Sequence, residues 1–96
     1  MTDDLKTDLH VLVIHPERII FEGKAKAVTG KNDNGTFDIL PLHSNFVSLI
    51  KEKVIIRTMD DLVQEIPIEQ AILKVLRNQV YIFIGISEDL APKITQ

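Results

Sequence analysis

The feature that most constrains this chain is its rhythm of short apolar runs separated by turn residues, about one run every 8–12 residues. Runs this short fit β-strands better than helices, because a strand needs only about 4–8 residues to cross a small core. We therefore predict an all-β domain. The expected strands fall within Leu9–Ile14, Ile19–Val28, Thr36–Leu40, Phe46–Ile50, Val54–Met59, Leu62–Ile68 and Val80–Ile86.

Alternation within these runs predicts which side chains face inward, since successive strand residues point to opposite faces of a sheet. In Thr36–Leu40, Phe37 and Ile39 are expected inside. In Ile19–Val28, Phe21, Gly23, Ala25 and Ala27 are expected to share one face, opposite Glu22, Lys24 and Lys26.

Three turn signals connect the expected strands. Asn34-Gly35 suits a hairpin, because both residue types accept positive φ at little cost. Asp60-Asp61 is expected to join Val54–Met59 and Leu62–Ile68 as a second hairpin, and the polar tripeptide Lys51–Lys53 is expected to be a turn.

One segment, Ile68–Arg77, is ambiguous. It follows Pro67 and places Ile68, Ile72, Val75 and Leu76 at helical spacing, and proline favours the first position of a helix. From the pattern alone, helix and strand are equally supported.

Composition excludes several classes of protein. The 96 residues suffice for one domain, and the absence of cysteine excludes disulfides and thiolate chemistry. The net charge of −3 and the lack of a basic patch argue against a nucleic-acid partner. No apolar run is long enough to insert into a membrane. The three histidines, His10, His15 and His43, are too scattered for a metal site, and no catalytic constellation is evident.

The segment Gly35–His43, "GTFDILPLH", places an apolar pair, a proline and a histidine directly after a glycine-containing turn. Pro41 disfavours helical backbone at Leu40 and ends the strand, which leaves Leu42 in a turn. Two interpretations remain open at this point. Leu40 and Leu42 either plug one end of the core or form a surface that a partner covers.

Three stretches, "VIHPERIIFEGKAKAVTG", "GTFDILPLH" and "AILKVLRNQVYIF", resemble the N-terminal domain of the epsilon subunit of rotary F-type ATP synthases, called delta in mitochondria. The resemblance implies a flattened β-sandwich of two roughly five-stranded sheets. It also implies that Ala71–Leu76 is a strand paired with Val80–Ile84, which resolves the ambiguous segment. The family's domain has no catalytic role and binds the gamma subunit and the c-ring in the central stalk.

The sequence departs from the family's pattern in several places. Thr36 stands where many members carry a glutamate implicated in the c-ring contact, and Asp38 and Leu42 replace glycines, as Gln70-Ala71 replaces a Gly-Gly pair. Those turns are expected to be remodelled, because glycine alone accepts positive φ freely. Members usually continue into a C-terminal helical hairpin that binds ATP in some bacteria. Without it, no cofactor or small-molecule ligand is expected for this chain, which is either a short form or a fragment.

We therefore predict a loose N-terminus over residues 1–8, the epsilon-type sandwich over residues 9–86 and a loose tail over residues 87–96. The expected role is a non-catalytic rotor subunit at the cytoplasmic face of a bacterial inner membrane, coupling ion transport to ATP synthesis. The alternative is a stand-alone β-sandwich that binds another protein. The residues expected to contact gamma or the c-ring are Gly35, Thr36, Phe37, Leu40, Pro41, Leu42 and His43.

Overall fold

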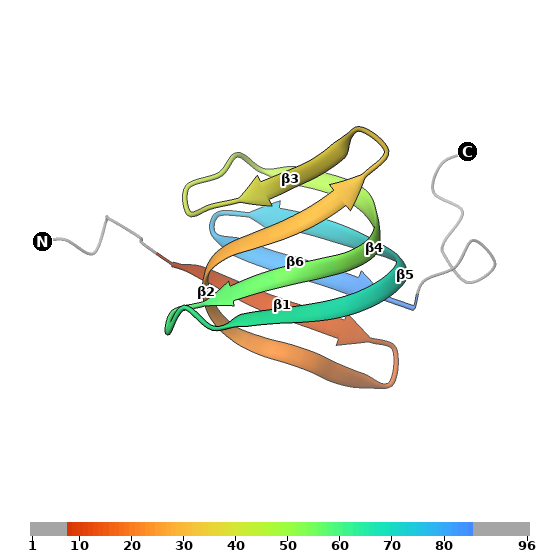
Figure 1. The fold of residues 1–96 in the computed structure, drawn as a ribbon, viewed down its shortest axis with the longest axis horizontal. Coiled ribbons are helices and arrows are strands. Elements are labelled where there is room, and N and C mark those ends of the chain that lie inside the picture. Colours follow the sequence, from red (N-terminus) through yellow and green to blue (C-terminus); the bar gives the residue numbers. More distant parts are fainter. Residues whose placement is uncertain (1–7, 86–96) are drawn as a thin grey trace, which may run out of the picture.

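The computed structural model describes residues 8–85, which form six β-strands (Figure 1). Their bounds are β1 Leu9–His15, β2 Arg18–Asn32, β3 Gly35–Ile39, β4 Phe46–Thr58, β5 Val63–Leu76 and β6 Gln79–Ile84. This part of the chain contains no helix, so none that could cross a membrane. The two ends predicted to be loose lie outside the described residues, apart from Asp8.

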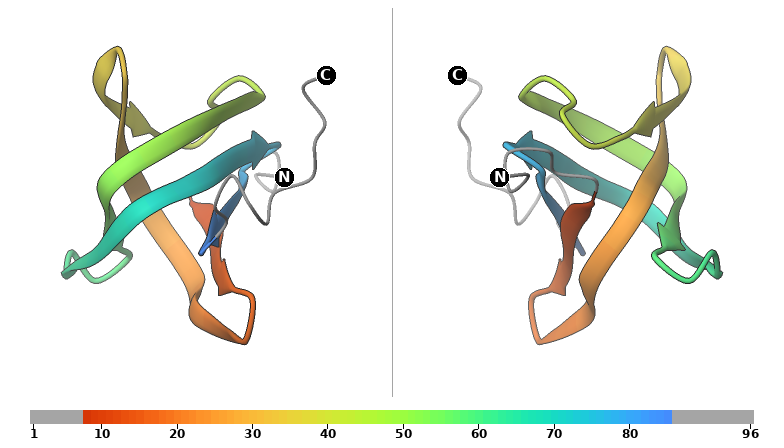
Figure 2. Two further views of the ribbon diagram at one scale, coloured as in Figure 1. Left: turned by 90° about the vertical axis from the view of Figure 1, so that its right-hand side faces the viewer. Right: turned by 90° about the vertical axis from the view of Figure 1, so that its left-hand side faces the viewer.

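The strands form one sheet in the order β1-β6-β5-β4-β2-β3, and an additional β1–β2 pairing closes it around the core (Figures 1 and 2). The β1–β6 pair is parallel and the other pairs are antiparallel. The predicted all-β, sandwich-like class is confirmed. The strand pairing is continuous through all six strands, because β2, β4 and β5 run for 15, 13 and 14 residues and bend around the core.

The ambiguous segment is strand. Ala71–Leu76 pairs with Gln79–Ile84 in antiparallel register, from Ala71 opposite Ile84 to Leu76 opposite Gln79. Arg77 and Asn78 make the connecting turn, and both have positive φ, of 53° and 68°. Two consecutive positive φ values are the geometry of the tight hairpin turns whose twist matches that of the flanking strands. The pairing predicted for Ala71–Leu76 is confirmed.

A β-bulge in β5 accounts for part of the misleading helical spacing, because it brings Ile68 and Val75 to the same face. Lys51 of β4 lies opposite Gln70, and the next residue, Glu52, lies opposite Ile68, so Glu69 is the extra residue. A bulge reverses which face the following residues take. The buried positions of β5 therefore change from even to odd numbers along the strand: Ile66, Ile68, Ala71, Leu73 and Val75.

The predicted turn at Lys51–Lys53 is wrong, because β4 continues through it without interruption. Glu52 adopts a left-handed conformation, with φ of 73°, directly opposite the bulge of β5. The local irregularity bends the two paired strands together instead of ending them. The polar side chains of this stretch point to solvent on the bend.

A second bulge shifts the faces of β2. Ala25 pairs with Thr58 and Ala27 with Arg57, so Lys26 has no partner residue in β4. As a result Ala25 and Val28 occupy core positions, and the prediction that Ala27 shares a face with Ala25 is wrong. The inward orientation of Phe37 and Ile39 in β3 is confirmed, since Ile39 is fully buried and Phe37 packs against the core.

The core consists of aliphatic side chains and contains no polar side chain among the described residues. It is built from every strand of the closed sheet, and its fully buried members of largest volume include Leu9, Ile39, Ile50, Ile56, Leu73 and Ile82. Phe37 and Phe46 meet edge to face at its border, with ring centroids 5.4 Å apart. Close packing of this kind makes substitutions at core positions costly.

The β4–β5 turn carries an exposed ion pair that links it to the β2 bulge. Lys26 Nζ lies 2.9 Å from Asp61 Oδ1, and this hydrogen bond, together with the lysine's charge, lowers the pKa of Asp61. A lowered carboxyl pKa stabilises the fold above the unfolded-state value of about 4, and this contribution is lost as the pH falls through the folded-state value.

We therefore expect the wild-type chain to melt slightly above its Asp61→Asn variant at neutral pH, with the gap closing in acid. Asparagine also tolerates the positive φ of Asp61, so the comparison isolates the charge. Thermal melts of both proteins across the acid range measure the gap. A gap independent of pH would show that the ion pair does not contribute.

Candidate partner-binding surface

The predicted site residues lie at the two ends of β3. Gly35 and Thr36 follow the β2–β3 turn, whereas Leu40, Pro41, Leu42 and His43 form the loop to β4. Thr36 and Leu40 are four residues apart, which is about 13 Å along a strand that rises about 3.3 Å per residue. The set therefore comprises two separate surfaces. Phe37 belongs to neither, because its ring packs inward against Phe46 and the core.

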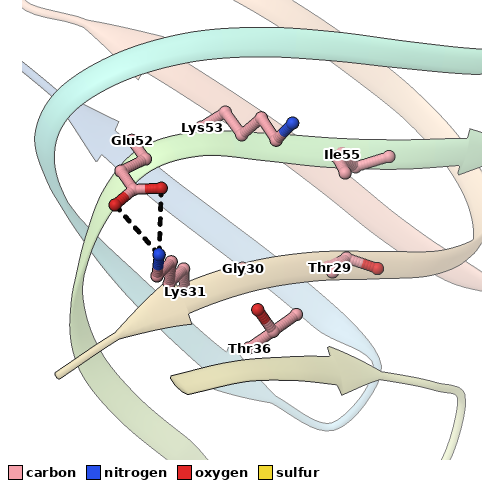
Figure 3. Close-up of a pocket in the computed structure, with 7 residues that line it drawn as sticks. All are labelled: Thr29, Gly30, Lys31, Thr36, Glu52, Lys53 and Ile55. Carbon is pink, nitrogen blue, oxygen red and sulfur yellow. Dashed lines mark hydrogen bonds and ion pairs between the residues drawn. The ribbon is translucent and has the colours of Figure 1, made fainter. Parts of the chain in front are cut away.

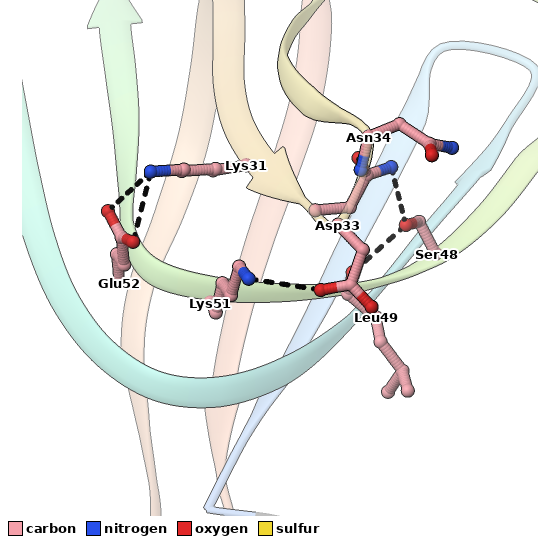
Figure 4. A network of polar contacts seen from close by, with 8 residues as sticks. Lys31, Asp33, Asn34, Ser48, Leu49, Lys51 and Glu52 are labelled. Atoms are coloured by element: carbon pink, nitrogen blue, oxygen red, sulfur yellow. Dashed lines mark hydrogen bonds and ion pairs between the residues drawn. The ribbon is translucent and has the colours of Figure 1, made fainter.

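Of the two residues expected to take positive φ in the β2–β3 turn, one does so. Gly35 has a φ of 124°, while Asn34 does not adopt positive φ. The Asn34 amide donates to the side-chain oxygen of Asn32 at 2.8 Å, which closes a local turn. Ion pairs of Lys31 with Glu52 and of Lys51 with Asp33, each at 3.0 Å, hold this turn against β4 (Figure 4).

A shallow depression of about 290 Å³ lies beside Thr36 (Figure 3). Its two lysines, Lys31 and Lys53, are each paired with a carboxylate, at 3.0 Å to Glu52 and 3.4 Å to Glu65. Because both charges are already compensated, the depression does not present a site for an anion. Its other lining residues are Thr29, Gly30 and Ile55.

The β3–β4 loop presents two leucines to solvent. Leu40 is 53% exposed and Leu42 is 72% exposed, so neither plugs the core. The His43 amide donates to the Leu40 carbonyl at 3.1 Å, which closes a four-residue turn over Pro41 and Leu42. Of the two interpretations of this segment, the structure therefore excludes the buried plug.

His43 supports the loop. Its ring meets Phe46 edge-on, with centroids 5.8 Å apart, and its Nδ1 lies 2.8 Å from the carbonyl oxygen of Ser44. The side chain is half-buried. These contacts connect the loop to the first residue of β4.

A larger apolar surface continues from this loop over the outside of the sheet, and the sequence did not predict it. We call it the outer apolar face. Strand pairing aligns its side chains in rows, because directly paired residues share a face. One row crosses five strands, and its members are Leu49, Ile72, Phe83, Ile14 and Ile19.

A second row runs beside the first. It contains Val47, Lys74, Tyr81 and Leu12 in directly paired positions. The rings of Tyr81 and Phe83 stack across the two rows, with centroids 6.3 Å apart and planes inclined by 12°. Val47 and Leu49 are 65% and 58% exposed, so the apolar rows are open to solvent at the β4 end.

The outer apolar face could be predicted from the sequence only if the register between the strands were known. Its members alternate with core residues along each strand, and both sets are apolar. Strands spaced about 4.8 Å apart place the five-strand row across about 19 Å of surface. Its end members Leu49 and Ile19 are exposed, and the three residues between them are half-buried. An apolar surface of this extent is a candidate for contact with another protein.

The histidines and acidic residues of the described part of the chain are dispersed. Residues 8–85 do not bring together three side chains able to hold a metal ion. His10, His15 and His43 belong to β1, β1 and the β3–β4 loop, and no nucleophile is hydrogen-bonded to any of them. What the geometry supports is binding through the outer apolar face and the adjacent loop.

Comparison with known proteins agrees with this architecture. The family model described as the β-sandwich domain of the ATP synthase delta/epsilon chain matches residues 8–88. The chain is 31% identical over 77 residues to the ATP synthase epsilon chain of Campylobacter fetus subsp. fetus, covering 79% of this chain and 60% of the relative. It is 40% identical over 47 residues to that of a Nitratiruptor species, covering 49% and 36% respectively. The chain thus spans less than two thirds of these relatives.

Two solved structures share the fold. A chain of the Euglena gracilis mitochondrial ATP synthase superposes with a TM-score of 0.77 at 13% identity, covering 88% of this chain and 59% of that one. A chain from the central stalk and c-ring of the Tetrahymena thermophila mitochondrial ATP synthase gives 0.69 at 11% identity, covering 95% and 79%. The family match extends over most of the sequence, including all six strands, and so the chain belongs to the family of ATP synthase delta/epsilon chain β-sandwich domains.

Proposed function

We propose that this chain is a non-catalytic rotor subunit of an F-type ATP synthase, which binds the gamma subunit and the c-ring in the central stalk. The observation that carries the proposal is the outer apolar face. The chain that bears it belongs to a family whose named members are ATP synthase chains. A rotor component needs stable protein contacts and no chemistry of its own. The exposed leucines of the β3–β4 loop and the outer apolar face support this proposal, because they offer apolar area for such contacts.

The two separate surfaces at the ends of β3 suit two different partners. We assign the outer apolar face and the loop Leu40–His43 to the gamma subunit, since a permanent contact between subunits is rich in apolar area. We assign the turn at Gly35 and Thr36 to the c-ring. That turn is polar and braced by ion pairs, as expected of a smaller contact made beside the first.

Two cations of β5 and the turn after it lie within and beside the gamma surface. Lys74 lies between Val47 and Tyr81 in the second row, and Arg77 occupies the adjoining β5–β6 turn. Both side chains are exposed. A partner that covers the apolar rows is therefore expected to carry acidic residues opposite them, and the association rate should fall as salt increases.

In this role the chain is held at the cytoplasmic face of a bacterial inner membrane through the complex, and it couples ion transport to ATP synthesis. Co-expression with the gamma subunit and c-ring of the same organism, followed by affinity purification, tests the assignment. We expect the 96-residue chain to co-purify with gamma alone and with the gamma–c-ring complex. If it is recovered free of both, the alternative of a stand-alone binding module replaces this proposal.

A further inference from the structure

Leu42 is held in a backbone conformation that a leucine normally avoids. Its φ is 71°, in the left-handed region that favours glycine. It is the third residue of the turn Leu40–His43, directly after Pro41. Turns with proline second and positive φ at the third residue are ordinarily completed by glycine or asparagine. The free domain would therefore be more stable with either residue at this position.

The strain at Leu42 is not compensated by burial. Its side chain is 72% exposed, the highest value among the large apolar side chains that the structure shows to be exposed. A leucine that is both strained and exposed does not stabilise the isolated fold. Backbone strain of this kind is found where the surroundings enforce it for a function, such as clamping a ligand.

The surroundings do enforce the position of Leu42. Its own amide donates to the side-chain oxygen of Asn78 at 2.7 Å, and the Arg77 amide donates to that of Asn45 at 3.3 Å. These two bonds attach both ends of the loop to the β5–β6 turn. The leucine is thus presented on a loop that is already fixed, and fixing a contact residue in advance reduces the entropy lost on binding.

The loop is continuous with the outer apolar face. Leu76, which is partly exposed, immediately precedes the turn that holds Leu42, and Val47 is the second residue of β4 after the loop. Leu42 therefore projects at the edge of the apolar rows instead of forming an isolated patch.

We propose that Leu42 is the residue by which this chain anchors and selects its gamma subunit, through insertion into an apolar depression on that partner. The inference rests on the proposed function and goes beyond it, because it assigns partner selection to one side chain. A gamma subunit without a matching depression would meet the exposed leucine as a steric obstacle and bind weakly.

The test compares three variants of the full chain, Leu42→Gly, Leu42→Asn and Leu42→Met, by thermal melting and by titration with the purified gamma subunit. Glycine and asparagine are expected to raise the melting temperature by a few degrees, because they relieve the strain. The same two variants are expected to bind gamma at least about tenfold more weakly. Methionine, which keeps an apolar side chain, should bind within about threefold of wild type.

The opposite sign of the two effects is the diagnostic result, since a variant that is merely damaged would lose both stability and binding. Wild-type affinity in Leu42→Gly and Leu42→Asn would overturn the anchor role, and the proposed function would stand if Leu49→Asp still abolished binding. A wild-type chain that does not bind gamma at all would overturn both.

Discussion

Replacing Val75 with aspartate is expected to unfold the domain, whereas the same replacement at Ile72, three residues earlier in β5, should leave it folded. Val75 is 2% exposed and pairs with Phe46 and Val80 in the core. The substitution forfeits about 2 kcal/mol of apolar burial and adds a cost of several kcal/mol for a buried, unpaired carboxylate. Together these approach the total stability of a small domain, about 5–15 kcal/mol.

Ile72 lies on the outer apolar face, where an aspartate stays hydrated. Circular dichroism and thermal melting of both variants measure the difference. In a strand the two positions differ because the odd separation places their side chains on opposite faces. Equal destabilisation by the two substitutions would contradict the assigned strand and its register.

Replacing Leu49 with aspartate should remove binding to the gamma subunit without unfolding the chain. Leu49 begins the five-strand row and is 58% exposed. An exposed substitution typically changes stability by no more than about 0.5 kcal/mol. A charge placed in an apolar interface that excludes water should lower the affinity at least about 100-fold, which corresponds to about 2.7 kcal/mol.

The matched control is Leu62→Asp. Leu62 is 64% exposed, but it lies in the β4–β5 turn beside Asp61, away from the outer apolar face. Calorimetric titration of gamma with both variants compares the same chemical change at two places. Leu62→Asp should bind as the wild type does. If both variants bound equally well, the outer apolar face would not be the gamma surface.

The face that each strand side chain takes could be predicted from the sequence wherever the alternation was not interrupted. The inward orientation of Phe37 and Ile39, and the positive φ of Gly35, followed from local chemistry. Alternation is interrupted at three bulges. Ile20, Lys26 and Glu69 each add one residue without a partner across the strand pair, and the residue types at these positions do not predict it.

The apolar residues at helical spacing in β5 come from both faces of the strand. Ile68 and Val75 are core residues that the bulge at Glu69 brings to the same face, whereas Ile72 and Leu76 lie on the other face. The resemblance to a known family resolved this where periodicity could not. The polar stretch Lys51–Lys53 misled as well, because a bend in a long strand and a turn both expose polar side chains.

The candidate site was less predictable than the fold. The exposed leucines of the loop were among the expected residues, but the outer apolar face was not, because it exists only through pairing between distant segments. Leu49, Ile72 and Phe83 are separated by 23 and 11 residues along the chain and become neighbours only in register. A single sequence fixes each strand's alternation but leaves open which of two apolar faces is covered by the domain itself.

A methyl NMR titration of the isotopically labelled 96-residue chain with the unlabelled gamma subunit shows directly which surface the partner covers. Methyl signals of the outer apolar face and the adjoining loop are expected to shift or broaden on binding, with Leu42, Val47, Leu49 and Ile72 among them. Signals of Leu62 and Val63, in and beside the β4–β5 turn, should stay in place. Perturbation confined to Leu62 and Val63, or an unchanged spectrum with gamma in excess, would contradict the claim that this chain joins the rotor through its outer apolar face.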